Sequence, residues 1–218
     1  RQITADDAQW VTDIKVGEKD PEQLGLACFP WSSDINQDQR VDSADASMIL
    51  QWIKTGSLNP PPAVGKSAEE RKASGYAAWD EKDAAPAVAI GTISGGPGQT
   101  LEAPITITTA TDLPLAGFSL SVGYPAGLDG LIYQGCVLGG DLAEQFSLSV
   151  KNSIENNWYG TIQISASNDT ELAAKGTVTL ATLTFEVANG AQTGAFPVRI
   201  LSFESNDAYG YTPRHDAP

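Results

Sequence analysis

The stretch that decides the fold lies near the C-terminal end, where residues 176–187 read GTVTLATLTFEV. Val178 and Leu180 alternate with threonine in one phase, and Leu183, Phe185 and Val187 alternate in the other phase. Strict alternation of apolar and polar residues is typical of a half-buried β-strand. The change of phase near residues 181–182 predicts a β-bulge or a strand that crosses between two sheets.

The same two-residue period recurs from about Ala87 onward, separated by short Gly-, Pro- and Asn-containing turns such as GGPG at residues 95–98. Short alternating strands with frequent turn residues predict an antiparallel all-β sandwich. The strands are marked by these apolar residues: Ile105 and Ile107; Phe118, Leu120 and Val122; Phe146, Leu148 and Val150; Ile162 and Ile164.

A different pattern fills residues 34–45, which read DINQDQRVDSAD. Side-chain oxygens fall at positions 1, 3, 5, 9 and 12 of this segment, which is how a calcium-binding loop supplies its ligands. Gln39 replaces the glycine that such loops usually carry at position 6. An acidic surface loop is the alternative interpretation. The predicted ligands are Asp34, Asn36, Asp38, Arg40 through its carbonyl, Asp42 and Asp45.

Each calcium-type segment is followed by a predicted helix. Apolar residues cover one face of residues 48–53, and Gly56 ends that helix. Residues 3–8 repeat the register of residues 41–46, and Trp10 and Ile14 then mark a first helix. We expect Trp10 and Trp52 to be core residues. The first copy begins at about its sixth loop position, which leaves Thr4 and Asp7 as a candidate second metal site.

Two loop–helix units of this kind resemble a dockerin, a calcium-dependent plug module. By that resemblance, residues 1–57 form a small α-helical module with Ca²⁺ as its cofactor. The residues just before each twelfth loop position would contact the partner; these are Ala5 and Asp6 in the first copy and Ser43 and Ala44 in the second.

The order of features in residues 87–205 resembles a cohesin, the receptor for a dockerin. The matching pieces include PGQT at residues 97–100, LAGFSL at 115–120 followed by Tyr124-Pro125, and the segment at 176–187. The resemblance implies a jelly-roll sandwich. The full expectation is therefore a two-domain chain with a Pro-rich linker at residues 58–86 and a C-terminal tail at residues 206–218.

Composition excludes several functions. A net charge of −14 over 218 residues argues against nucleic-acid binding. No apolar run reaches the length of a membrane span. The single histidine, His215, lies in a polar tail, and the chain has no nucleophile motif or Cys/His metal cluster, so we expect no enzymatic activity.

An extracellular location is expected, and two features fit it. Cys28 and Cys136 are candidates for a disulfide, with two unpaired thiols as the alternative. Asn168 begins an N-glycosylation sequon.

Three functions follow from this organisation. The first is a subunit that polymerises head to tail into a filament, favoured because the short Pro-rich linker would hinder the helical module from reaching its own sandwich. The second is an adaptor that joins other proteins. The third is a calcium-dependent module for polysaccharide, with Tyr133, Trp158 and Tyr159 as candidate stacking residues.

Overall fold

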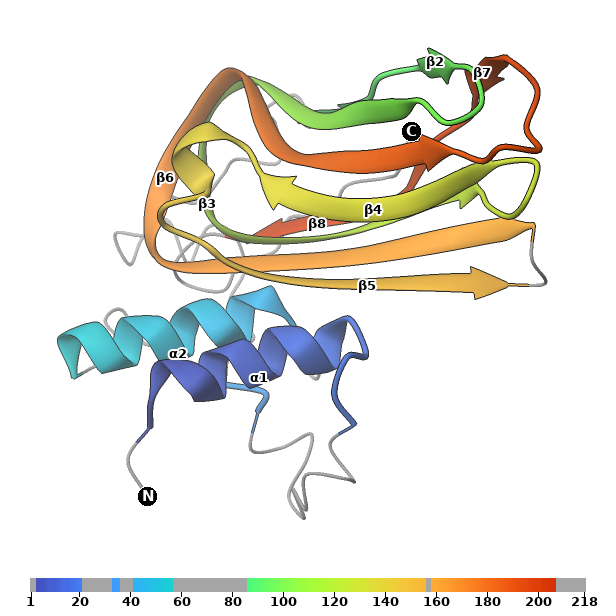
Figure 1. The fold of residues 1–218 in the computed structure, drawn as a ribbon. Helices are drawn as coiled ribbons and strands as arrows, with labels where there is room; N and C mark the ends of the chain where they lie inside the picture. Colours follow the sequence, from blue (N-terminus) through green and yellow to red (C-terminus); the bar gives the residue numbers. More distant parts are fainter. Residues whose placement is uncertain (1–2, 21–32, 36–40, 57–85, 156–157, 207–218) are drawn as a thin grey trace.

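The computed structural model describes residues 3–20, 33–35, 41–56, 86–155 and 158–206. Two helices precede an all-β sandwich (Figure 1). The helices are α1 (Ala5–Lys15) and α2 (Ser43–Thr55). The sandwich consists of β1 (Ala87–Ile90), β2 (Ile93–Gly95), β3 (Thr100–Pro125), β4 (Leu131–Leu138), the 3₁₀ turn η1 (Gly140–Leu142), β5 (Ser147–Glu155), β6 (Tyr159–Val187), β7 (Gly194–Phe196) and β8 (Arg199–Asn206).

Two long strands, β3 and β6, run through both layers of the sandwich. The first part of β3, residues 100–109, pairs antiparallel with the last part of β6, residues 176–186. In this layer β1 lies beside β3 and β4 lies beside β6. The other halves, 117–125 and 159–167, also pair, and here β8 lies beside β3 and β5 beside β6. Between the halves the register shifts, and the strands bend from one layer into the other (Figure 1). The predicted all-β sandwich is confirmed.

The predicted change of phase is a β-bulge on β6. Ile105 pairs with Ala181, but its neighbour Thr106 pairs with Thr179, so Leu180 is the extra residue. Leu180 and Ala181 are both fully buried. A bulge allows two consecutive side chains to face the core, which explains why the apolar period slips at this point.

One apolar cluster fills the space between the two layers. The rings of Tyr124 and Phe185 lie 5.1 Å apart at its centre, and both residues are fully buried. Gly160 lies opposite Tyr124 on β6, and a Cβ atom there would lie 2.1 Å from the tyrosine ring. The glycine is therefore required by close packing rather than by backbone conformation.

Both predicted helices are present. α2 begins at a capping box, in which the Asp42 side chain accepts from the amide of Asp45 and the Asp42 amide donates to Asp45 Oδ2, and it ends at Gly56 in the left-handed conformation. The two helices share a small core of Ala8, Val11, Ala46 and Ile49. The expectation for Trp52 is wrong, because its side chain is 44 % exposed. The buried part of α2 is its N-terminal half, residues 43–49, because that end of the helix contacts the sandwich.

The helices lie directly against the sandwich, below the layer that contains β5 and β8 (Figure 1). The expectation that the linker holds the helical module away from its own sandwich is therefore wrong. Residues 57–85, which include most of the predicted linker, lie outside the described residues. β8 ends at Asn206, so the sandwich extends one residue past its predicted boundary.

Candidate functional site

The candidate site is the outward side of the layer β8–β3–β6–β5, on which both helices lie. We call this surface the docking face; it carries Asn206, Gly117, Ser119, Ser165 and Ser149. Strand alternation produces it, because Phe118 and Leu120 point into the core while their neighbours point outward. Side chains this small allow a helix to approach the sheet closely.

The N-terminal end of α2 contacts the docking face through Asn206. The hydroxyl of Ser43 donates to Asn206 Oδ1 at 2.8 Å, and Asn206 Nδ2 donates to the hydroxyl of Ser47 at 3.4 Å. The Ser47 hydroxyl, which has one hydrogen to donate, lies 2.9 Å from the carbonyl of Ser43 in its own helix and 3.1 Å from the carbonyl of Ala116 on the sheet. Ser43, Ser47 and Asn206 are each at most 2 % exposed, so these hydrogen bonds are shielded from water.

Gly117 makes room for this contact. It pairs with Asn206 on β8, and a Cβ atom at Gly117 would lie 2.4 Å from Asn206 Oδ1. No pair of non-bonded heavy atoms of this kind approaches so closely, so any larger residue would displace the asparagine side chain. The glycine thus fixes the position of the acceptor that Ser43 uses.

Helix α1 contacts the docking face through Ser149 on β5. Gln9 Nε2 donates to Ser149 Oγ at 2.7 Å. Ser149 Oγ lies 2.7 Å from Asp13 Oδ1 and 2.8 Å from Thr12 Oγ1. A hydroxyl has one hydrogen to donate, and the carboxylate is the stronger acceptor. Ser149 is only 4 % exposed, so a single small side chain joins three residues of the helix.

The charge of Asp13 is stabilised within this contact. Burial would raise the pKa of Asp13, but hydrogen bonds from Lys19, Ser149 and Gln9 outweigh it, and the pKa lies below its ordinary value. The Lys19 ammonium lies 2.6 Å from Asp13 Oδ2. The carboxylate is therefore ionised in the docked form over the ordinary pH range.

Charged side chains surround the two buried contacts. Lys15 pairs with Glu204 on β8 at 3.4 Å, and Lys54 pairs with Asp169 on β6 at 3.2 Å. Lys151 on β5 donates to the carbonyl of Gly17. Half-exposed ion pairs contribute about 0–1 kcal/mol each, so they orient the helices more than they stabilise them.

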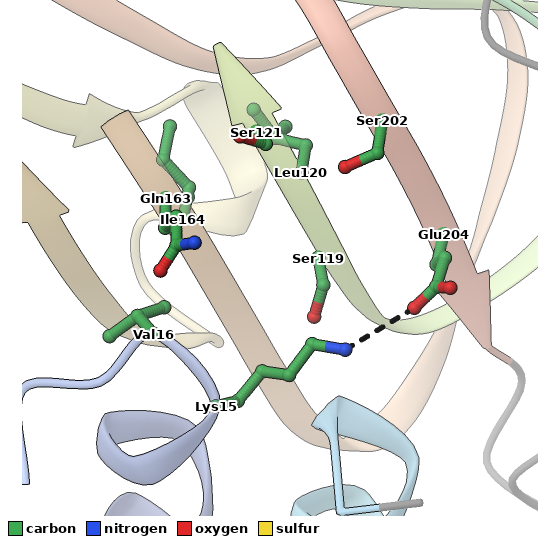
Figure 2. A pocket seen from close by; sticks show the side chains of 9 residues that line it. All are labelled: Lys15, Val16, Ser119, Leu120, Ser121, Gln163, Ile164, Ser202 and Glu204. Carbon is green, nitrogen blue, oxygen red and sulfur yellow. Dashed lines mark hydrogen bonds and ion pairs between the residues drawn. The ribbon is translucent and has the colours of Figure 1, made fainter. Parts of the chain in front are cut away.

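The helices leave part of the docking face open. A cavity of about 310 Å³ lies between the C-terminal end of α1 and the sheet (Figure 2). Figure 2 shows the Lys15–Glu204 ion pair at one side of this cavity. The cavity is mostly polar; its lining is Lys15, Val16, Ser119, Leu120, Ser121, Gln163, Ile164, Ser202 and Glu204.

Of the predicted calcium ligands, the structure describes Asp34, Asp42 and Asp45. They are 8 %, 1 % and 0 % exposed. Asp45 accepts from the amides of Ile35 at 2.6 Å and Asp42 at 2.9 Å, so its carboxylate ties the two ends of the loop together. Asn36, Asp38 and Arg40 lie outside the described residues.

Among the described residues, no group of three His, Cys, Asp or Glu side chains is placed to hold a metal ion. The carboxylates that are described nevertheless fit a calcium loop in chemistry, because carboxylate oxygens are ligands that calcium prefers; the burial of Asp42 and Asp45 does not itself require a metal, because both carboxylates accept hydrogen bonds from backbone amides. The calcium site therefore stays a prediction.

The predicted second metal site and partner contacts have different surroundings. Thr4 and Asp7 form the capping box of α1, in which the Thr4 amide donates to Asp7 Oδ2 at 2.8 Å. Ala5 and Asp6 are exposed. Ser43 and Ala44 are buried at 2 % and 0 % exposure, and Ser43 is bonded to this chain's own docking face. Whether Thr4 and Asp7 bind a metal stays a prediction.

The predicted disulfide and glycosylation residues that the structure describes, Cys136 and Asn168, lie on β4 and β6. Cys136 is on β4, where burial raises the pKa of its thiol to about 12; Cys28 lies outside the described residues, so the disulfide stays a prediction. The Asn168 side chain is 5 % exposed and donates to Thr170 at 3.4 Å, so glycosylation there would have to precede folding.

The three aromatic residues suggested for polysaccharide do not form a row. Tyr133 is partly buried and packs edge-on against the core residue Phe185, with the ring centroids 6.1 Å apart. Trp158 is 76 % exposed and Tyr159 is 41 % exposed, both at the start of β6. His215 lies outside the described residues.

Few features of the sequence indicate the docking face. Ser149, Asn206 and Gly117 resemble ordinary surface or turn residues in the sequence. The partners of Ser149 on α1, Gln9 and Thr12, occupy polar positions that a helical pattern assigns to solvent. The only available signal was the run of serine and glycine at the outward positions of residues 117–123 and 163–167.

Comparisons with known proteins agree with the sandwich architecture. The model of the cohesin domain family matches residues 86–212. No curated protein matches the chain. None of the helices in the described residues is long and apolar enough to cross a membrane.

Three solved structures illustrate the similarity. A non-cellulosomal cohesin from Archaeoglobus fulgidus is 17 % identical, with 60 % of this chain and 84 % of that chain covered and a TM-score of 0.44. A type I cohesin–dockerin complex from Clostridium thermocellum is 17 % identical, with 59 % and 91 % covered and a TM-score of 0.46. A type II cohesin–X-dockerin complex from Acetivibrio cellulolyticus is 12 % identical, with 60 % and 92 % covered and a TM-score of 0.46.

Proposed function

Because the chain belongs to the cohesin domain family through residues 86–212, we propose that it is an extracellular assembly subunit whose docking face takes a dockerin-like helix pair from another copy of itself. Cohesin domains are non-catalytic protein–protein interaction modules, and this one carries a helix pair of its own. A receptor and a plug in one chain are two different surfaces. Contacts between different surfaces build open filaments unless the rotation closes a ring.

The observation that carries the proposal is the fit between α2 and the docking face. Ser43, expected from the sequence to contact a partner, is bonded to Asn206 with both side chains buried. The atoms of this contact would be the same if the helices came from a second copy. Residues 57–85 link the two parts; a chain of roughly 30 residues can span up to about 100 Å when extended, enough to reach a neighbour.

Calcium would act in this proposal by folding the helix pair. Its own core consists of four small or medium residues, Ala8, Val11, Ala46 and Ile49. A core of this size supplies little stability, and small modules often rely on a metal or on a partner. Asp34, Asp42 and Asp45, with Asn36, Asp38 and the carbonyl of Arg40, would hold the ion and thereby fix the start of α2.

The alternative is an adaptor, in which the docking face takes helices from a different protein. Both functions use the same surface, because the difference between self and non-self lies in a few side chains. The Ser43–Asn206 contact favours the self-assembling function, since this chain's own helix already complements the face. Binding of polysaccharide is the weaker candidate, because Tyr133 is partly buried and packs against the core.

The test is the size of the purified protein, measured by light scattering and electron microscopy in millimolar calcium and again after EDTA. Filaments or large oligomers that dissolve on chelation are expected. The double variant Asp34→Ala/Asp45→Ala should abolish assembly, whereas the control Glu102→Ala/Glu144→Ala removes the same charge from exposed positions and should not. A protein that is monomeric in calcium at every concentration would refute self-assembly and leave the adaptor function.

A further inference from the structure

We propose that the helix pair is also a latch: in an isolated subunit α1 and α2 cover their own docking face, and assembly proceeds by exchange of the helix pair between copies. This inference rests on the proposed function, because it concerns how the same face is regulated. It adds that the free subunit is a closed form that cannot take a neighbour's helices until its own have left.

The closed form is specified by contacts within one chain. Asn206 accepts a hydrogen bond from Ser43. Ser149 accepts a hydrogen bond from Gln9 and lies within hydrogen-bond distance of Asp13. These two contacts lie at opposite edges of the docking face, on β8 and β5. A second helix pair therefore cannot enter while the first is bound, because both anchoring side chains are buried beneath it.

Competition between the two forms follows from chain connectivity. A ligand tethered to its site within one chain meets that site at an effective concentration set by the length and stiffness of the linker, up to about millimolar. Closure therefore dominates in dilute protein, and exchange becomes favourable only as the concentration of subunits rises toward that value. Exchange keeps every contact and changes only which chain supplies it, which is the usual basis of domain swapping.

The geometry of Thr12 and Ser149 offers a direct test. Their hydroxyl oxygens lie 2.8 Å apart, on α1 and β5 respectively. A pair of cysteines at these positions is close enough for a disulfide. The variants are made in the full-length chain with Cys28 and Cys136 replaced by serine.

The experiment compares Thr12→Cys/Ser149→Cys with a control in which the second cysteine is at Ser153, farther along β5. In dilute, oxidised samples the first variant should give a cross-linked monomer that migrates faster on a non-reducing gel, and the control should not. The locked monomer should fail to assemble in calcium, and reduction should restore the level of assembly that the same variant shows when it has never been oxidised.

A mixture of copies tests the exchange itself. Chains with only Thr12→Cys are mixed with chains that carry only Ser149→Cys. Cross-linked dimers should appear at the rate at which filaments form. Hydrogen exchange on the wild-type chain is a control without introduced cysteines: the amides of α1 should be protected in the dilute monomer.

The outcomes separate the two proposals. A ladder of cross-linked oligomers with no cross-linked monomer, an unprotected α1 in the monomer, or a locked monomer that assembles as fast as the reduced one would each overturn the latch. A reduced chain that assembles under no condition would overturn the filament. In that case the latch is still decided by whether the disulfide joins residues of one chain.

Discussion

Replacing Gly117 by alanine should release α2 from the docking face. The new Cβ atom would lie 2.4 Å from Asn206 Oδ1, so the asparagine side chain must move. That movement breaks the 2.8 Å hydrogen bond from Ser43 and the 3.4 Å bond to Ser47. A buried hydrogen bond contributes about 0.5–1.5 kcal/mol, and a stranded buried hydroxyl costs about 1–3 kcal/mol.

The expected loss in docking free energy is therefore about 1–3 kcal/mol, which lowers the closing equilibrium by roughly 5- to 150-fold. Alanine in a strand regains about 0.5–1 kcal/mol relative to glycine, which places the net effect toward the lower end. The assay is hydrogen exchange of the amides in α1 and α2, which reports the opening free energy. Gly135→Ala on β4 is the matched control, because nothing lies within 4 Å of its added Cβ.

A double-mutant cycle tests the reasoning itself. Asn206→Ala removes the same two hydrogen bonds and should cost a similar amount. In Gly117→Ala/Asn206→Ala the new Cβ atom no longer meets the amide group of Asn206, and its remaining close contact is 3.1 Å to the carbonyl of Ala166. The double variant should thus be about as well docked as Asn206→Ala alone. Additive effects, within about 0.5 kcal/mol, would show that Gly117 does not act through Asn206.

Three further predictions address the other contact, its titration and the sandwich core. Ser149→Ala should weaken docking of α1 by about 1–3 kcal/mol, because partners of a buried hydroxyl lose their bond; hydrogen exchange of α1 measures this, and unchanged protection would contradict it. In the folded chain the pKa of Asp13 is lowered from its ordinary value of 3.8, because hydrogen bonds from Lys19, Ser149 and Gln9 outweigh its burial; its contribution to the stability of the folded chain is therefore complete above about pH 4 and is lost as the pH falls through the lowered value. Asp13→Asn should remove this acid dependence, and a persistent one would assign it to another group. Gly160→Ala should destabilise the sandwich by about 1–3 kcal/mol in urea unfolding, because its Cβ would meet the Tyr124 ring at 2.1 Å; a wild-type midpoint would refute the packing argument.

The sandwich was predictable because apolar and polar residues alternate along a strand that is buried on one face and exposed on the other. Phe118, Leu120 and Val122 are all buried, as their alternation indicates. The bulge at Leu180 was also visible in the sequence, as a change of phase in the apolar alternation, because two consecutive side chains face the core there. The helices were predictable from the spacing of their apolar residues and from Gly56, which marks where α2 ends.

The docking of the helices was not predictable from these patterns. Hydrophobic periodicity detects apolar faces, and the contacts here are made by Ser149, Asn206 and Ser43. Polar residues of this size are the usual occupants of a solvated surface. The prediction for the linker failed on related grounds: a Pro-rich composition describes local stiffness and does not determine where the two ends of the segment lie.

The order of elements along the chain has a consequence for folding during synthesis. Both helices are made before the sandwich, but the docking face needs β5 and β8, and β8 is the last strand among the residues that the structure describes. The helix pair therefore exists without its own binding surface until the whole sandwich has emerged. During that interval it is open to capture by a completed sandwich nearby, so the local density of nascent chains determines whether a newly made chain closes on itself or joins a neighbour.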